Sequence, residues 1–410
     1  MMSRKSPQLR FEGFTDDWEE RKLKDVLYIS KARNKSHKYG KEDVLSVSRE
    51  VGTVNQIEYQ GRSFAGSDIS NYKVVQGGEL IYTKSPLKGA PYGIFQVATL
   101  EGILSPLYAV YNSTDKAYTP FVAMALKTDS IATHYLSPLV AKGAKNTINV
   151  TDEGALQGKI KFPNILEQKQ IFIFFKQLDD TIALHQRKLD LLKEQKKGYL
   201  QKMFPKNGAK VPELRFAGFA DAWEQRKLGE SCRIGDIDHR MPKSVTEGVP
   251  YLMTGDFIGE NKLNFENTKL VSIEDYDQLS KKIKPEYGDI LFARYASVGA
   301  VRYVDIQRKF LISYSCAIMK PNIDIKGLFL YQLLQTDFMK RKIEFEINPN
   351  SQKNIGIDSL KKLKISIPII EEQEKIGKFF KDLDNTIALH QRKLDLLKEQ
   401  KKGFLQKMFV

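Results

Sequence analysis

The stretch TIALHQRKLDLLKEQKKG occurs twice in this chain, letter for letter, at residues 181–198 and 386–403. The offset between the copies is 205 residues, half of the 410-residue length. A second motif, LRF-x-GF-x-x-x-WE-x-RKL, recurs at the same offset, at Leu9–Leu23 and Leu214–Leu228. The middles of the two halves share only scattered identities. Because internal repetition sets the architecture, the sequence predicts two copies of one scaffold that carry two different inserts.

Near the end of each half, apolar residues recur at a spacing that alternates between four and three, from Ile171 to Met203 and from Ile376 to Met408. Each series forms an apolar seam along one face of a helix. A seam sustained over more than four heptads predicts a coiled coil. One histidine and one lysine interrupt each seam. We interpret His185 and His390 as polar residues that fix the register. A metal or catalytic role is the lesser alternative, because no ligand set lies near either histidine in the sequence.

The spacing of these features predicts an α+β protein with two mixed α/β domains and two long helices. A helix over roughly 167–203 is about 55 Å long, and proline at position 205 ends it. The linker that follows is short, so the second helix must run back antiparallel to bury its seam, which gives an elongated rod with internal pseudo-two-fold symmetry. The predicted segments are 1–163 (first domain with its N-terminal scaffold segment), 164–204 (first helix), 205–212 (linker), 213–368 (second domain) and 369–410 (second helix).

Within the inserts, apolar runs punctuated by glycine predict strands, and two segments predict helices. The expected strands lie in Tyr39–Tyr59, Gly78–Thr83, Ile94–Leu100, Lys159–Phe162, Tyr251–Asn264, Gly288–Phe292 and Lys364–Ile369. The expected helices are Phe121–Leu126 and Leu328–Ile343. Trp18 and Trp223 belong to the shared scaffold, so we expect them to be packing anchors rather than stacking surfaces.

Composition narrows the class of partner. The formal charge of +15 favours a polyanion, nucleic acid before an acidic membrane surface. With two cysteines in the whole chain, neither a disulfide framework nor a zinc site is expected. The first ten residues are polar and basic, and no run of roughly 18 apolar residues occurs. We therefore expect a cytoplasmic protein.

Common catalytic signatures are missing from the sequence. GALQGK at 154–159 is one residue too short for a phosphate-binding loop and is followed by isoleucine instead of a hydroxyl residue. The segment Asn348–Asn350 lacks the second proline and the aromatic residue of an adenine methylase motif. Five scattered histidines suggest no cluster. We predict a protein that is not an enzyme, with no catalytic residue, metal or cofactor of its own.

The inserts do present basic, amide and aromatic residues at glycine-marked loops. Arginine and amide side chains are the usual readers of base edges, and lysines mostly contact phosphates. The alternative for each loop is a solvated turn. The candidate DNA-binding residues are Lys84, Ser85, Lys88, Lys145, Asn146, Arg294, Tyr295, Ser297, Lys353 and Asn354. The candidate partner-binding residues on the helices are Phe174, Lys188, Lys193, Phe379, Lys393 and Lys398.

The whole chain resembles the specificity subunit of type I restriction–modification systems. The resemblance rests on WEQRKLGE at 223–230, on GDILF at 288–292 followed by Arg294, and on Ile367-Pro368 with Glu372-Gln373 and the terminal heptads. The first insert departs from this pattern, because GEL at 78–80 replaces Gly-Asp-Ile and Lys84-Ser85 stands at the arginine.

This resemblance implies that each insert recognises one half of a split DNA site. It also implies that the helices set the spacer between the half-sites and dock two methylase subunits. S-adenosylmethionine, and ATP with Mg²⁺, would belong to the methylase and restriction subunits. Two other functions stay open on the residues alone: a coiled-coil scaffold that holds two protein-binding domains without touching DNA, and a nuclease with an unrecognised site.

Overall fold

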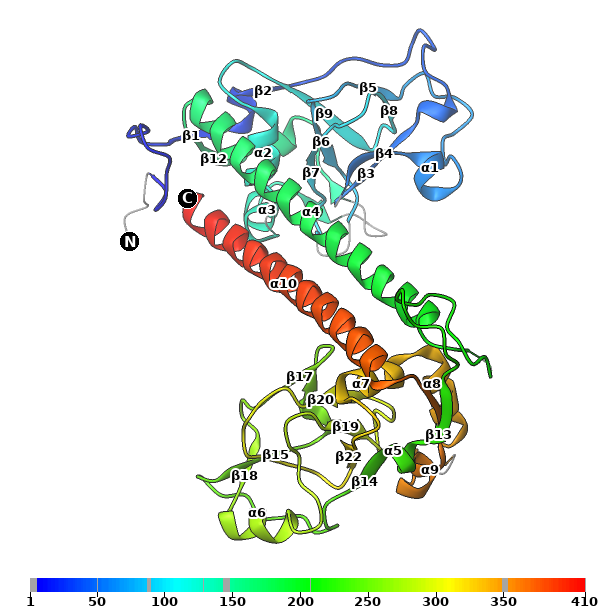
Figure 1. The fold of residues 1–410 in the computed structure, drawn as a ribbon. Coiled ribbons are helices and arrows are strands. Elements are labelled where there is room, and N and C mark those ends of the chain that lie inside the picture. The colour runs from blue at the N-terminus through cyan, green and yellow to red at the C-terminus, as the bar shows by residue number, and fades with distance from the viewer. Residues whose placement is uncertain are drawn as a thin grey trace. The chain divides into compact units, whose positions relative to one another are not determined.

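The computed structural model describes residues 6–49, 51–86, 90–127, 129–142, 148–206, 208–348 and 353–409 (Figure 1). These form two compact units. Unit 1 comprises Met1–Leu184 with Leu394–Val410, and unit 2 comprises His185–Lys393. The domain boundaries proposed from the sequence stay predictions.

Unit 1 is built on an antiparallel sheet of four strands in the order β2-β9-β6-β7. Smaller two-stranded sheets pair β1 with β12, β3 with β4, β5 with β8 and β10 with β11. The strands are β1 (Glu19–Lys22), β2 (Leu27–Ile29), β3 (Leu45–Ser48), β4 (Gly52–Asn55), β5 (Lys73–Val75), β6 (Leu80–Thr83), β7 (Phe95–Val97), β8 (Gly102–Leu104), β9 (Tyr108–Ser113), β10 (Ala141–Lys142), β11 (Ile148–Asn149) and β12 (Lys159–Phe162). The short helices are α1 (Gln56–Gln60), α2 (Thr119–Ala125) and α3 (Asp129–Leu136).

Unit 2 repeats the central sheet in the order β14-β22-β19-β20, again antiparallel. Around it lie a three-stranded sheet, β18-β15-β21, and two pairs, β13-β23 and β16-β17. The strands are β13 (Glu224–Lys227), β14 (Cys232–Gly235), β15 (Val249–Leu252), β16 (Phe257–Ile258), β17 (Lys262–Leu263), β18 (Lys269–Val271), β19 (Ile290–Ala293), β20 (Val301–Tyr303), β21 (Leu311–Ile312), β22 (Cys316–Pro321) and β23 (Lys364–Ile367). The short helices are α5 (Leu228–Ser231), α6 (Ile273–Leu279), α7 (Gly327–Gln335), α8 (Asp337–Phe345) and α9 (Ile357–Lys362).

The two inserts thus share a central sheet that their sequences do not reveal. What differs is the material attached to it: β3-β4 and β5-β8 in unit 1, and a partly parallel sheet with α6 in unit 2. The α+β class, the repeated scaffold and the two divergent inserts are confirmed.

The repeated LRF motif has a physical role in both units. Arg215 donates from Nε and Nη2 to the two carboxylate oxygens of Glu372, at 2.7 Å each, and Glu372 is fully buried. Arg10 makes the same two-pronged bond to Glu167 in unit 1, at 2.9 and 2.7 Å. Each bond ties the N-terminal scaffold segment of its unit to the first turn of a long helix, a bidentate geometry that suits arginine.

Two long helices, α4 (Ile165–Lys202) and α10 (Ile370–Met408), contribute residues to both units. In unit 2, Lys196 Nζ lies 2.7 Å from an oxygen of Asp384, and the Tyr199 and Phe379 rings are 5.0 Å apart. Later residues of α4 therefore meet earlier residues of α10, which makes the pair antiparallel, as predicted.

Unit 1 shows the same antiparallel pattern. Phe174 and Phe404 have ring centroids 5.1 Å apart, and Lys401 pairs with Asp179. This ion pair is the repeat equivalent of the one between Lys196 and Asp384 in unit 2. The seam lysines therefore have acidic partners on the opposing helix, which restricts the register.

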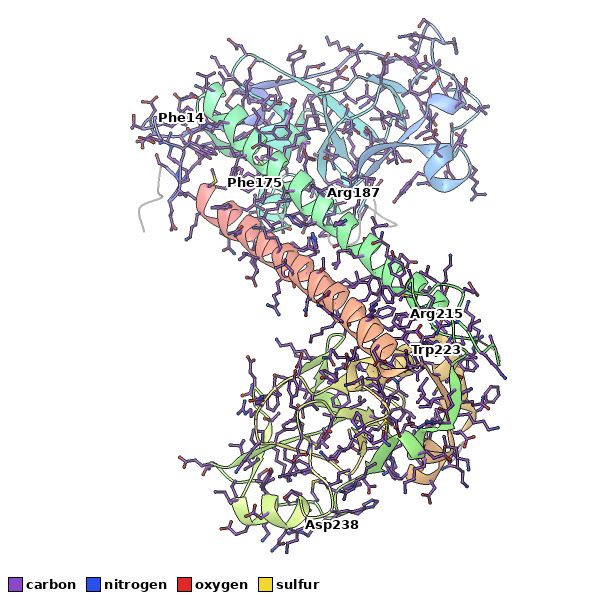
Figure 2. All side chains as sticks on the ribbon, in the orientation of Figure 1. Phe14, Phe175, Arg187, Arg215, Trp223 and Asp238 are labelled. Atoms are coloured by element: carbon purple, nitrogen blue, oxygen red, sulfur yellow. The ribbon has the colours of Figure 1, made fainter. Side chains whose placement is uncertain are left out.

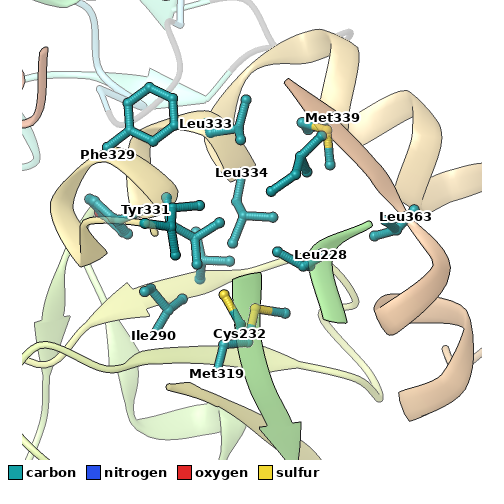
Figure 3. Close-up of a cluster of buried hydrophobic side chains, with 14 of the residues drawn as sticks. Leu228, Cys232, Ile290, Met319, Phe329, Tyr331, Leu333, Leu334, Met339 and Leu363 are labelled. Atoms are coloured by element: carbon teal, nitrogen blue, oxygen red, sulfur yellow. The ribbon is translucent and has the colours of Figure 1, made fainter. Parts of the chain in front are cut away.

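The main core of unit 2 fills the space between the central sheet and helices α5, α7 and α8 (Figure 3). Figure 3 shows Leu228, Cys232, Ile290 and Met319 facing Leu334 and its neighbours in this core. Trp223 is buried against Phe329, with ring centroids 5.6 Å apart, and lies in the same unit as Arg215 (Figure 2).

Trp18 is likewise buried in unit 1, against Phe121 at 6.0 Å. Both tryptophans are thus packing anchors, as expected.

Local capping explains where the predicted elements were wrong. Part of the expected strand region Tyr39–Tyr59 is helix α1, because the Asn55 side chain accepts bonds from the amides of Ile57 and Glu58, at 3.0 and 3.2 Å. The expected helix Leu328–Ile343 is two helices, α7 and α8. Thr336 separates them, since its extended backbone and its bond from Met339 N–H start a new helix.

Candidate nucleic-acid interface

The glycine–acid motif before β6 and before β19 forms the same tight turn in both units. Gly78 and Gly288 have φ of 91° and 92°, in the left-handed region that favours glycine. The next residue, Glu79 or Asp289, accepts from the amide three residues earlier, at 2.7 Å in each case. The motif thus starts a buried strand whose far end carries the candidate loop.

In unit 2, Arg294 directly follows that strand, β19, but the guanidinium of Arg294 is buried inside the protein. Arg294 is 6% exposed. Its Nη1 donates to Asp236 and its Nε to the carbonyl oxygen of Ile355 at 3.0 Å. These bonds engage two of the three guanidinium nitrogens, so Arg294 braces the loops in this structure rather than facing solvent, and its contact with DNA stays a prediction.

Asp236 is the centre of a cluster of basic side chains. Besides Arg294, it accepts from Lys282 Nζ at 2.8 Å and lies 3.0 Å from His239 Nε2. Burial raises the pKa of Asp236, but the bonds from Lys282 and His239 and the nearby positive charges outweigh it, and the pKa ends below its usual value. The His239 ring stacks on Tyr314 with centroids 4.8 Å apart.

The structure brings the two predicted loops of unit 2 together. The amide of Ile355 donates to the carbonyl oxygen of Arg294 at 3.1 Å, and Tyr295 forms an antiparallel bridge with Asn354. Ser297 and Lys353 are exposed beside this junction, and Tyr295 and Asn354 are half-buried. Four of the candidate residues therefore share one loop cluster.

In unit 1 the candidate Lys84 follows β6 and pairs with Asp152, which also accepts from Lys73. Burial lowers the pKa of Lys73, and the Asp152 carboxylate only partly offsets this. Ser85 is exposed next to Lys84. Unit 1 thus also holds its loops with a shared carboxylate, although that acid comes from a different segment of the insert.

The remaining unit 1 candidates, Lys88, Lys145 and Asn146, lie outside the described residues. Whether they join Lys84 and Ser85 stays a prediction.

Sequence reasoning missed a basic loop that follows β2, KARNKSHK at 31–38. Lys31, Lys35 and Lys38 are exposed there. The backbone of Arg33 forms an isolated antiparallel β-bridge with Lys73, which belongs to the Asp152 cluster. The loop after β14 in unit 2, which carries His239, has the corresponding place in its unit. Four lysine or arginine residues in eight were the available signal, but this loop contains no glycine, and the binding candidates were predicted at glycine-marked loops.

The helix candidates divide into two kinds. Phe174 packs on Phe11 and Phe404, and Phe379 packs on Tyr199 and Phe216, so both rings belong largely to the cores of their own units. The lysines, by contrast, are exposed: Lys188, Lys193, Lys393 and Lys398.

No group of three or more His, Cys, Asp or Glu side chains suited to a metal occurs in the part of the chain that the structure describes. Cys232 and Cys316 are buried free thiols whose pKa burial raises to about 12, so they are poor nucleophiles. Among the same residues, no helix is long and apolar enough to cross a membrane.

Comparison with known proteins agrees with this architecture. The family model for the type I restriction modification DNA specificity domain matches twice, at residues 15–194 and 220–399. A Methanocaldococcus jannaschii protein named as the MjaX type I restriction enzyme specificity subunit is 24% identical over 425 residues, covering 95% of this chain and 92% of that protein. The MjaVIII specificity subunit of the same organism is 24% identical over 257 residues, 60% of each chain.

The fold agrees as well. A crystal structure of the type I restriction–modification S subunit from M. genitalium superposes with a TM-score of 0.61 at 15% identity, covering 99% of both chains. The two family matches are separated by the same offset as the repeated helix sequence. This chain belongs to the type I restriction–modification DNA specificity family.

Proposed function

We propose that this chain is the DNA-recognition subunit of a type I restriction–modification complex and that each unit recognises one half of an asymmetric, bipartite site. One observation carries the proposal: the two units share a central sheet and scaffold yet attach different loops to it. Equal scaffolds present the two sets of loops in equivalent ways, and unequal loops select different bases. The net charge of +15 adds salt-dependent attraction to phosphates.

In unit 2 the proposed contact surface is the loop cluster of Tyr295, Ser297, Lys353 and Asn354. Asparagine suits adenine edges, and lysine suits phosphates. The buried ion pair between Arg294 and Asp236 supports this loop cluster. Because Arg294 is bonded to both Asp236 and Ile355, its role in this proposal is to position the loops.

In unit 1 we propose Lys84, Ser85 and the basic loop 31–38 as contacts. Lys88, Lys145 and Asn146 remain part of the proposed surface on sequence grounds. The lysines lie in the loop after β2, where they are exposed, and in the loop after β6, where Lys84 is half-buried; β9 alone separates these two strands in the central sheet. Such a distribution suits a backbone-tracking contact more than a single base contact.

The two long helices complete the proposal. We propose that their exposed lysines, Lys188, Lys193, Lys393 and Lys398, meet two methylase subunits, that the helix length sets the unread spacer, and that restriction subunits can join. In such a complex the methylase subunits bind S-adenosylmethionine and the restriction subunits use ATP with Mg²⁺. The chain itself contributes recognition and no catalysis.

The test is to map modified adenines in cells that carry this gene with its partner genes. Wild type should give one split motif. Asn354→Ala should relax base preference in one half of the motif and leave the other half unchanged. Lys284→Ala, an exposed residue of the same unit, serves as the matched control and should leave the whole motif intact. A change in both halves, or in neither, would contradict the assignment of unit 2 to one half-site.

The competing function, a scaffold that holds protein-binding domains without DNA, makes a different prediction. Its complex with partners would show no salt-sensitive binding to duplex DNA. The number and placement of exposed lysines in both units favour DNA recognition.

A further inference from the structure

The two seam histidines form a pair in unit 2. The Nδ1 atoms of His185 and His390 are 3.2 Å apart, and the ring centroids are 5.4 Å apart with an interplanar angle of 49°. Both rings are half-buried. The flanking seam positions in the same unit, Leu189 and Ile387, are buried and apolar.

This nitrogen–nitrogen distance suits chelation of one metal ion. Imidazole nitrogens bind Zn²⁺ at about 2.0–2.1 Å. Two nitrogens 3.2 Å apart at such bond lengths subtend an angle of roughly 100° at the metal. That angle lies between the 90° of square or octahedral sites and the 109° of tetrahedral sites, so the distance between the two nitrogens need not change.

We propose that His185 and His390 form a two-histidine chelate for a late first-row divalent cation, with Zn²⁺, Ni²⁺ and Cu²⁺ as its class. The ion bridges α4 and α10 at this point, and water fills its other positions. Imidazole is a favoured ligand for these metals, and Cu²⁺ binds tightest in the series. The inference is independent of the proposed DNA contacts.

Binding of one cation by both Nδ1 atoms requires that each ring carry its proton on Nε2. If one Nδ1 holds the proton of the 3.2 Å contact, only the other Nδ1 has a lone pair available. For both Nδ1 atoms to bind a cation, the donor ring moves its proton from Nδ1 to Nε2. When both rings are neutral, this tautomer change releases no proton, and the nitrogen–hydrogen–nitrogen bond is replaced by two nitrogen–metal bonds.

The test is calorimetric titration of the untagged full chain with Cu²⁺ and Ni²⁺. We expect one site per chain that either His185→Gln or His390→Gln weakens by at least tenfold, while the double variant weakens it by less than the product of the two single effects. Such non-additivity is the signature of a chelate. His37→Asn, at an exposed histidine of the basic loop, is the matched control and should retain the site.

A second measurement needs no variant. The electron paramagnetic resonance spectrum of the wild-type chain with one equivalent of Cu²⁺ should show coupling to two equivalent nitrogens. A spectrum with one imidazole nitrogen or none, or single variants that bind as tightly as the His37→Asn control, would overturn the proposal.

Discussion

Replacing Arg215 by alanine removes the partner of both carboxylate oxygens of Glu372, which is fully buried. Breaking a buried ion pair by deleting one member costs about 3–5 kcal/mol, because the remaining charge is left uncompensated. The Arg215 side chain is 14% exposed, so water can enter the space that it leaves, and we expect a loss of about 2–4 kcal/mol. With a denaturant slope of about 2 kcal/mol per molar urea, the unfolding midpoint of unit 2 should fall by roughly 1–2 M.

Tryptophan fluorescence can follow this change in one unit alone. The chain has two tryptophans, one in each unit. In a Trp18→Phe background, Trp223 therefore reports on the core of unit 2. Urea titrations would compare Arg215→Ala with Arg226→Ala, which removes a bond to the exposed Glu224.

The control should leave the midpoint almost unchanged, because exposed ion pairs contribute little. The double variant Arg215→Met with Glu372→Leu should recover much of the loss, since it leaves no buried charge. A midpoint for Arg215→Ala equal to that of the control would refute the role given to this ion pair.

Three further outcomes are expected. The pKa of Asp236 is lower in the folded protein than its ordinary value of 3.8, so its stabilising effect is complete above pH 3.8 and is lost as the pH falls through the folded-state pKa. Asp236→Asn should therefore destabilise unit 2 at pH 7, and urea titrations should show the gap from wild type narrowing in strong acid. Lys353→Ala should lower the slope of log affinity against log salt by about one without changing the preferred sequence, as measured by fluorescence anisotropy. A half-chain of residues 1–206 should form a homodimer in light scattering, because its segment 189–204 repeats the segment 394–409 that completes unit 1, whereas a chain of residues 1–190 should not dimerise.

The sequence was most informative where the signal is periodic or duplicated. The heptads predicted a helix at 167–203, and α4 spans Ile165–Lys202. Trp18 and Trp223 were correctly expected in the core because both copies of the scaffold contain them. When the same residue occurs at the same place in both copies of a repeat, two segments of the sequence indicate its environment instead of one.

The environments of the other site residues could not be predicted, because they depend on residues that are far away in the sequence. The environment of Arg294 depends on Asp236, which is 58 residues earlier in the chain, and on the carbonyl oxygen of Ile355. No local pattern around Arg294 indicates that an acid from another loop will neutralise it. The same holds for His185 and His390, whose contact follows from the antiparallel register of two helices 205 residues apart. Loop residues such as Ser297 and Lys353 were predicted as DNA-binding candidates, but the fold alone shows that they lie close together.

The link between each scaffold segment and the end of a long helix has a topological consequence. The amide of Leu214 donates to the carbonyl oxygen of Lys202 at 2.9 Å in unit 2, and the amide of Leu9 donates to that of Lys407 at 3.0 Å in unit 1. In unit 2 the two partners are joined by a short covalent linker, whereas in unit 1 the same hydrogen bond forms between opposite ends of the sequence. Covalent continuity is therefore not required for this contact, because the copy in unit 1 forms between two segments that are far apart in the sequence.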